Sequence, residues 1–193
     1  MSGNKRWLLP LIGLLAVLAA TQAPRLFRHG QAVPAIGGDF ALTDQQGRTV
    51  HDADFRGKLM LVYFGYTFCP DVCPTTLAQV AQVLKSLPPE QQAEIAPIFI
   101  TVDPERDTVE QMAQYVASFS PALIGLTGTP DQIAPVLKEY HVYAKKAGSG
   151  ENYGMDHTSI LYLMGKDGRF LRHFNADASN QEIAGALQQA LKG

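Results

Sequence analysis

The stretch that decides the fold runs from residue 59 to residue 74 and reads Leu59-Met60-Leu61-Val62-Tyr63-Phe64-Gly65-Tyr66-Thr67-Phe68-Cys69-Pro70-Asp71-Val72-Cys73-Pro74. Its first six residues are all apolar or aromatic, which predicts a strand buried on both faces. Pro74 favours the start of a helix at this point, because proline is well tolerated in the first helical position. We therefore predict a strand–loop–helix unit that carries both cysteines of the chain at its junction.

Strands and helices alternate on both sides of this unit. Turn residues and alternating or continuous apolar runs predict further strands at residues 39–43, 48–51, 97–102, 122–126, 159–164 and 169–174. Capping patterns and helical spacing predict further helices at residues 107–119, 129–140 and 179–191. The strand at 122–126 is expected at a sheet edge. The pattern predicts an α/β fold with a mixed central sheet flanked by helices and with an N-terminal β-hairpin.

Composition excludes several classes of protein. The chain has 193 residues, 46% hydrophobic and 18% charged, with a formal net charge of −2. This composition is globular rather than disordered. The near-neutral charge lacks the basic footprint of a nucleic-acid-binding protein. Two cysteines are too few for a disulfide scaffold, and their separation of four residues indicates a site.

The first 23 residues have the pattern of an export signal or a membrane anchor. Lys5 and Arg6 precede an apolar run from Trp7 to Ala20 that continues weakly to Ala23. The sequence lacks an Ala-x-Ala cleavage site here, and we favour an uncleaved anchor over a cleaved signal peptide. Residues 24–38 are expected to be a linker and residues 39–193 a single domain, exported to the oxidising side of the cytoplasmic membrane and facing the periplasm or the cell exterior.

Three kinds of site fit the pair Cys69 and Cys73. A structural disulfide would close a loop of only about five residues and stabilise the chain weakly. A redox-active pair without metal is the second alternative, and a metal site is the one we favour, because reactive groups collect at the carboxyl ends of strands. At a helix N-terminus, the dipole and the free N–H groups are expected to favour the thiolate.

A third ligand for such a site must come from elsewhere in the chain. His29, His51, His141 and His173 are interpreted as surface or turn histidines. His157 differs, because it lies in a loop before a predicted strand and follows Asp156, whose carboxylate could orient the imidazole. Two thiolates and one imidazole form a soft donor set that favours Cu(I), accommodates Cu(II) and has zinc as its rival. Met155 is interpreted as packing or solvent-facing rather than as a fourth ligand.

A second polar loop follows the strand expected at residues 97–102. It reads Val102-Asp103-Pro104-Glu105-Arg106-Asp107-Thr108. The favoured interpretation is a capped helix start, which accounts for Asp107 and Thr108. The alternative is an electrostatic rim for docking a partner, and it would also give Asp103 and Arg106 a role.

These motifs together resemble the Sco/SenC copper proteins, thioredoxin-like assembly factors for cytochrome c oxidase. The resemblance extends from about Asp39 to the C-terminus and rests on an ordered set of motifs. They are Gly57-Lys58, Phe64-Gly65-Tyr66-Thr67, Cys69-Pro70-Asp71-Val72-Cys73-Pro74, Val102-Asp103-Pro104-Glu105-Arg106-Asp107, Gly125-Leu126-Thr127-Gly128 and Asp156-His157-Thr158. The expected membrane anchor also fits the tethered topology of that family.

The resemblance implies a thioredoxin-like fold in which Cys69, Cys73 and His157 bind copper. It implies delivery of copper to the binuclear CuA site of oxidase subunit II, or reduction of that site's cysteines beforehand. A copper donor protein is a further expected partner. The leading hypothesis is therefore a copper metallochaperone rather than an enzyme. The alternative is a thiol-disulfide reductase in which Cys69 attacks a partner disulfide and Cys73 resolves the mixed disulfide. A thioredoxin-fold peroxidase, with Arg106 as the peroxide-stabilising donor, is a third and less favoured class.

Overall fold

The computed structural model describes residues 36–192. The predicted anchor and nearly all of the predicted linker lie outside these residues. No helix within the described part is long and apolar enough to cross a membrane.

A seven-stranded mixed sheet forms the centre of the domain, with strand order β2-β1-β5-β4-β3-β8-β9. Its strands are β1 (Ala41–Asp44), β2 (Thr49–His51), β3 (Leu59–Gly65), β4 (Ile95–Thr101), β5 (Ile124–Thr127), β8 (Leu161–Met164) and β9 (Phe170–Phe174). Strands β3, β4 and β5 run parallel, while β1 and β8 pair antiparallel to this central group. The mixed sheet and both predicted hairpins, β1–β2 and β8–β9, are confirmed.

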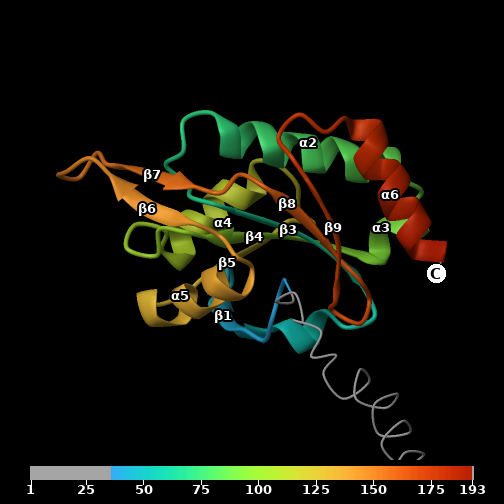
Figure 1. Cartoon of the computed structure of the whole chain (residues 1–193), viewed down its shortest axis with the longest axis horizontal. Helices are drawn as coiled ribbons and strands as arrows, with labels where there is room; N and C mark the ends of the chain where they lie inside the picture. Colours follow the sequence, from blue (N-terminus) through green and yellow to red (C-terminus); the bar gives the residue numbers. More distant parts are fainter. Residues whose placement is uncertain (1–35, 193) are drawn as a thin grey trace, which may run out of the picture. The chain divides into compact units, whose positions relative to one another are not determined.

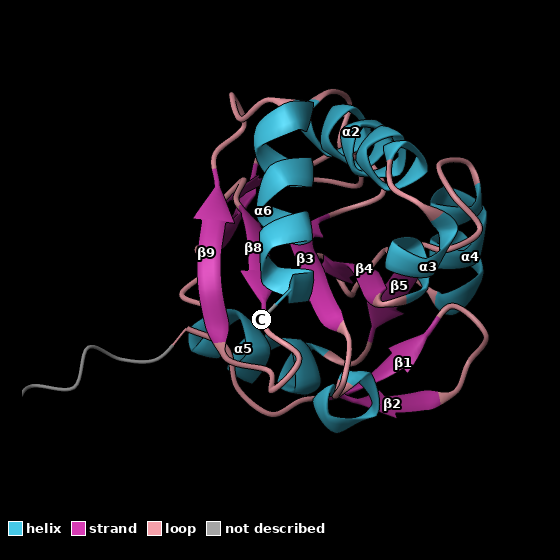
Figure 2. Cartoon of the chain, turned by 90° about the vertical axis from the view of Figure 1, so that its right-hand side faces the viewer, coloured by secondary structure: helices cyan, strands magenta, loops and turns pink. Residues whose placement is uncertain are grey.

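Helices cover both faces of this sheet (Figure 1). They are α2 (Val72–Ser86), α3 (Pro89–Ala93), α4 (Val109–Ala117), α5 (Pro130–Glu139) and α6 (Asn180–Lys192), and a short 3-10 turn η1 (Asp52–Phe55) follows β2. Figure 2 shows α2 and α6 side by side on one face. The remaining pair of strands, β6 (Ala144–Ala147) and β7 (Gly154–His157), forms a separate two-stranded sheet.

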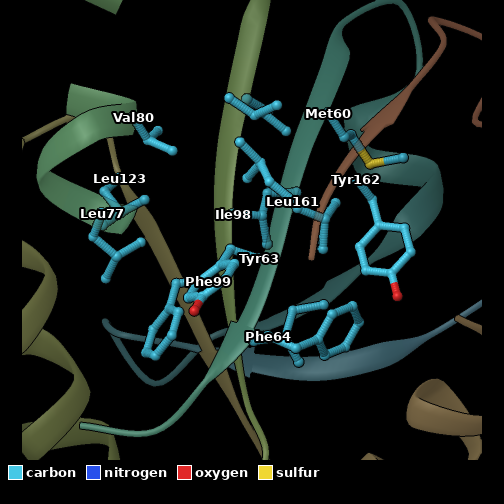
Figure 3. Close-up of a cluster of buried hydrophobic side chains, with 14 of the residues drawn as sticks. Met60, Tyr63, Phe64, Leu77, Val80, Ile98, Phe99, Leu123, Leu161 and Tyr162 are labelled. Atoms are coloured by element: carbon cyan, nitrogen blue, oxygen red, sulfur yellow. The ribbon is translucent and has the colours of Figure 1, made fainter. Parts of the chain in front are cut away.

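The core lies on both sides of β3, as its apolar sequence predicts. Every residue of β3 and of β4 is buried. Because side chains alternate along a strand, Tyr63 packs toward α2 with Phe99, while Phe64 packs on the opposite face. Figure 3 shows this division, with Leu77 beside Tyr63 and with Tyr162 beside Phe64. The Phe64 ring lies 5.1 Å from the ring of Tyr140, which directly follows α5.

Several sequence-based expectations were wrong in detail. Strand β5 lies between β1 and β4 rather than at an edge. Helix α2 begins at Val72, so Pro74 is its third residue rather than its first. Proline is tolerated there because the first N–H groups of a helix have no intrahelical acceptor. The strand pair β6–β7, the helix α3 and the turn η1 were not predicted.

Alanine substitutions at two glycines test the packing of this fold, because one should lower and the other should raise the free energy of unfolding. A methyl group on Gly125 of β5 would clash with Cγ of the fully buried Met112. We expect Gly125→Ala to lower the free energy of unfolding by about 1–3 kcal/mol through overpacking. Gly185 of α6 is exposed and has open space around it, so Gly185→Ala should raise that free energy by up to about 1 kcal/mol. Urea denaturation of both variants checks the pair, and an unchanged midpoint for Gly125→Ala would contradict the packing described.

Candidate metal centre

The two cysteines lie where β3 passes into α2, at the carboxyl end of the central strand. Cys69 occupies the connecting loop, and Cys73 is the second residue of α2. Both are free thiols, and both are buried, Cys73 completely. The predicted strand–loop–helix placement is therefore confirmed.

The structure brings His157 to this pair across 84 residues of sequence. Its Nε2 lies 3.6 Å from Sγ of Cys73. The donor atoms of Cys69, Cys73 and His157 all lie within 4.8 Å of one another. Among the described residues, His51, His141 and His173 are exposed and do not belong to this group, as expected. His29 lies outside the described residues.

His157 is the last residue of β7 rather than part of a loop, and a backbone carbonyl orients its ring. Nδ1 lies 3.1 Å from the carbonyl oxygen of Thr158. A proton on Nδ1 that is donated to this carbonyl leaves the Nε2 lone pair facing Cys73. The expected orienting partner was the carboxylate of Asp156, but that residue is exposed and contributes only its charge. Burial lowers the pKa of His157, which favours the neutral imidazole that a metal requires.

Cys73 occupies a tight pocket that is closed to solvent. A methyl group on Gly65 would lie 2.6 Å from the Cys73 sulfur, so the absence of a side chain there makes room for the thiol. The hydroxyl of Tyr63 lies 3.9 Å from the same sulfur. Burial raises the pKa of Cys73 to about 12. The expectation that the helix N-terminus favours the thiolate was therefore wrong for Cys73, because the loss of solvation outweighs the dipole.

Asp107 has a different role from the predicted helix cap. Thr108 is the N-cap of α4, and its hydroxyl accepts a hydrogen bond from the backbone N–H of Gln111. The Asp107 side chain is fully buried and accepts hydrogen bonds from the Thr67 hydroxyl at 2.7 Å and the Thr101 hydroxyl at 2.6 Å. It also accepts from the backbone N–H of Thr67. Asp107 thus binds the cysteine loop to the end of β4.

The alternative interpretation of this loop, a docking rim, does not hold for two of its three carboxylates. Asp103 is 3% exposed and pairs with Arg106, and Asp107 faces inward. Only Glu105 reaches solvent, where it pairs with Lys146 at 3.0 Å. The sequence does not show that these carboxylates are buried, because an acidic residue beside a helix start reads as a cap or a surface charge.

An open cleft of about 380 Å³ lies over the cysteine loop and β7. Cys69 and His157 line it, while Met155 forms part of its wall beside Tyr66. The Tyr66 ring meets the His157 ring edge to face, with centroids 5.8 Å apart. Sequence reasoning assigned no role to Tyr66 or to the Thr158 carbonyl. Tyr66 belongs to the motif around the cysteines, but nothing in its spacing indicates contact with a residue 91 positions away.

The arrangement is chemically suited to a soft metal or to disulfide exchange. Two sulfurs and an unprotonated imidazole nitrogen form a donor set for Cu(I). The two cysteine sulfurs also lie within 4.8 Å of each other, and such proximity is what a dithiol–disulfide pair requires. Arg106, the donor that a peroxidase would need, pairs with Asp103 through Nε and donates to the carbonyl of Tyr153 through Nη1, while its buried Nη2 has no hydrogen-bond partner among the described residues.

Comparison with known proteins identifies many relatives of this chain. A family model described as SCO1/SenC matches residues 28–192. The mitochondrial SCO2 homolog of Bos taurus is 44% identical over 181 residues, covering 91% of this chain and 68% of the relative. The SCO2-like protein of Rickettsia prowazekii is 40% identical over 180 residues, covering 89% of this chain and 87% of the relative. The chain spans about half of the human mitochondrial SCO1 homolog, with 43% identity and 52% coverage of that protein.

Solved structures of similar proteins include two that hold copper. ScoI of Bradyrhizobium japonicum with copper bound has a TM-score of 0.76 and 48% identity, covering 81% of this chain and 99% of that chain. Yeast Sco1 with copper bound has a TM-score of 0.76 and 31% identity, covering 83% of this chain and 90% of that chain. The expected thioredoxin-like fold is thereby confirmed.

The burial of the two thiols predicts an order of chemical modification. In the reduced, metal-free protein at pH 7.5, iodoacetamide should alkylate Cys69 before Cys73. Cys69 lines the open cleft, whereas Cys73 is completely buried and its high pKa keeps the thiol protonated. Mass spectrometry of quenched samples measures both rates, and the urea-unfolded protein serves as the control in which the rates converge. Equal rates in the folded protein would contradict the described burial.

Proposed function

Because this chain belongs to the SCO1/SenC family, we propose that it is a copper metallochaperone for the CuA site of cytochrome c oxidase subunit II. The observation that carries this proposal is the cluster of Cys69, Cys73 and His157, whose donor atoms lie within 4.8 Å of one another. The copper-bound state of two similar structures supports it. Copper is the cargo here, bound for transfer to a partner.

The chemistry of the three donors fits Cu(I) as the form delivered. Two thiolates and one imidazole satisfy a soft ion in trigonal coordination, and the same groups can hold Cu(II). Cys69 and His157 line the open cleft, whereas Cys73 lies behind them. A thiolate of the acceptor protein would therefore approach through the cleft and join the metal from the side of Cys69 and His157.

The cellular setting belongs to the same proposal. We propose that the N-terminal segment tethers the chain to the cytoplasmic membrane and that the domain faces the periplasm or the cell exterior. Copper would arrive from a separate donor protein and leave for the CuA domain of subunit II. The near-neutral charge of the chain gives no reason to add nucleic acid to these partners.

A second candidate function is a thiol-disulfide reductase, and the free state of two neighbouring thiols favours it. The Cys69 thiolate would attack a partner disulfide, and one partner sulfur would leave as a thiol. Cys73 would then attack the mixed disulfide, which releases the second partner thiol and leaves a Cys69–Cys73 disulfide. A reductant in the same compartment would have to restore the pair.

Variants of the three donors test the metal site directly. We expect Cys69→Ser, Cys73→Ser and His157→Ala each to weaken Cu(I) binding by at least about 100-fold, because loss of a direct ligand should cost no less than loss of its supporting partner. His173→Ala is the matched control, since His173 is exposed on β9 and lies outside the cluster. Competition with a Cu(I) chelator gives the affinities, and X-ray absorption counts two sulfurs and one nitrogen in the unmodified protein.

The same measurements separate the two candidate functions. Wild-type affinity in His157→Ala would remove His157 from the ligand set. Absence of tight copper binding in the unmodified chain, together with a reduction potential well below about −200 mV for the cysteine pair, would favour the reductase.

Copper affinity should rise with pH. Burial holds the pKa of Cys73 at about 12, so its thiol is protonated at neutral pH and must release a proton when copper binds. Burial lowers the pKa of His157, so its imidazole competes less with protons for the metal than an exposed histidine does. Each proton released raises the apparent affinity about tenfold per pH unit, so the change from pH 6.5 to 7.5 should be at least about tenfold. Calorimetry in buffers of different ionisation enthalpy counts the protons released on copper binding. An affinity independent of pH would show that copper binding does not release the proton of the Cys73 thiol.

A further inference from the structure

The strand that carries His157 is not hydrogen-bonded into the central sheet. Strands β6 and β7 pair only with each other within the described residues, and Figure 1 shows this ribbon projecting past the ends of the central strands. An isolated two-stranded sheet has little stability of its own in water. The position of His157 relative to the cysteines therefore depends on contacts between this ribbon and the rest of the domain.

At the base of the ribbon, the chain on either side is held together. The backbone N–H of Thr158 donates to the Tyr143 carbonyl at 3.0 Å, and the Tyr143 N–H donates to the Thr158 hydroxyl at 3.0 Å. These two contacts join the ends of the ribbon to each other. They do not bind it to the loops that carry the cysteines.

Arg106 supplies that connection at the start of β7. Its Nη1 donates to the carbonyl of Tyr153 at 2.9 Å and lies 3.3 Å from the carbonyl of Glu151. Its guanidinium also lies 3.6 Å from the centroid of the Tyr153 ring. Tyr153 is buried, and its hydroxyl donates to Asp103 at 2.7 Å. Asp103 in turn accepts from Nε of Arg106, which closes a ring of contacts.

Arg106 also lies close to the cysteine loop. The guanidinium carbon lies 4.7 Å from the ring centroid of Phe68 and 5.8 Å from that of Tyr66. Phe68 directly precedes Cys69, and Tyr66 contacts the His157 ring. One planar cation therefore contacts both the loop that carries Cys69 and Tyr153, the residue that directly precedes the strand carrying His157. Guanidinium groups stabilise such positions because they stack on aromatic faces and donate hydrogen bonds in their own plane at the same time.

We propose that Arg106 is a positioning residue for copper binding. Together with Asp103 and Tyr153 it forms a clamp, hereafter the Arg106 clamp, that holds β7 against the cysteine loop and so sets the place of the His157 nitrogen beside Cys69 and Cys73. This inference rests on the proposed function of those three residues as copper ligands. Without the clamp, the ribbon keeps its base at Tyr143 and Thr158 but loses its attachment at Tyr153.

The first experiment needs no copper. In Arg106→Ala of the full chain, amide hydrogen exchange at residues 153–158 should accelerate at least about tenfold in the metal-free state, while β3 and β4 stay protected. Arg48→Ala is the matched control, because Arg48 also pairs with a buried carboxylate, Asp44, but on the β1–β2 hairpin. It should leave exchange at residues 153–158 unchanged. Acceleration throughout the central sheet would indicate a general loss of stability and would overturn the local clamp.

The second experiment measures the metal. X-ray absorption of Cu(I)-loaded Arg106→Ala should show two sulfurs with the nitrogen lost, and Cu(I) affinity should fall about tenfold or more. Arg48→Ala should retain two sulfurs and one nitrogen. A purely structural role for Arg106 would lower stability without this change in the ligand count.

Tyr153→Phe keeps the test decisive if Arg106→Ala does not fold. This variant removes only the hydroxyl that donates to Asp103, and it should produce a smaller acceleration in the same segment. Unchanged exchange at residues 153–158 and an unchanged ligand count in the variant that folds would overturn the proposal. If the unmodified chain itself binds no Cu(I), the proposed function fails, and the exchange experiment still decides whether Arg106 holds the ribbon.

Discussion

Asp107 joins the ends of the three parallel strands at the point where the site is built. Its carboxylate accepts from Thr67 after β3 and from Thr101 at the end of β4. Its backbone carbonyl accepts from the hydroxyl of Thr127, the last residue of β5, at 2.6 Å. A fully buried carboxylate is costly unless donors surround it, and here hydroxyl and amide donors do so. Since Thr67 lies two residues before Cys69, the interaction that orders the strand ends also orders the cysteine loop.

The candidate metal centre therefore consists of a well-supported half and a more loosely attached half. Cys69 and Cys73 lie at the end of a strand that is buried along its whole length, and Gly65 leaves space for the Cys73 sulfur. His157 lies on a ribbon whose hydrogen bonds are internal to itself. Such a division would suit the proposed copper chaperone, because His157 could move without disturbing the core. The Arg106 clamp lies at the boundary between the two halves.

The helix dipole and burial shift the pKa of Cys73 in opposite directions, and the effect of burial is the larger. A helix N-terminus stabilises an anion by at most about 2 kcal/mol, while removal of a thiolate from water costs more than that. The metal-free thiol consequently stays protonated, and its sulfur has the neutral imidazole of His157 at 3.6 Å and the hydroxyl of Tyr63 at 3.9 Å as polar neighbours. A metal ion that displaces the proton supplies the positive charge that the pocket lacks. Burial thus makes Cys73 a poor nucleophile in the free protein and a competent ligand in the presence of a soft cation.

The sequence by itself determined the local units of this protein. The apolar run of β3, the cysteine-bearing start of α2, the two hairpins and the cap of α5 at Thr129 were predictable because strand periodicity, turn residues and caps act between near neighbours. Only the tertiary structure decided the interior place of β5 and the nearness of His157 to Cys73, since strand order and contacts across 84 residues leave no local pattern. Ribbon strand β6 lacks the apolar alternation of a packed strand, and so its sequence, Ala144-Lys145-Lys146-Ala147, gave no signal. Asp107 was misread as a cap because local spacing cannot show which carboxylates the folded chain encloses, and enclosure is what gives this one its role.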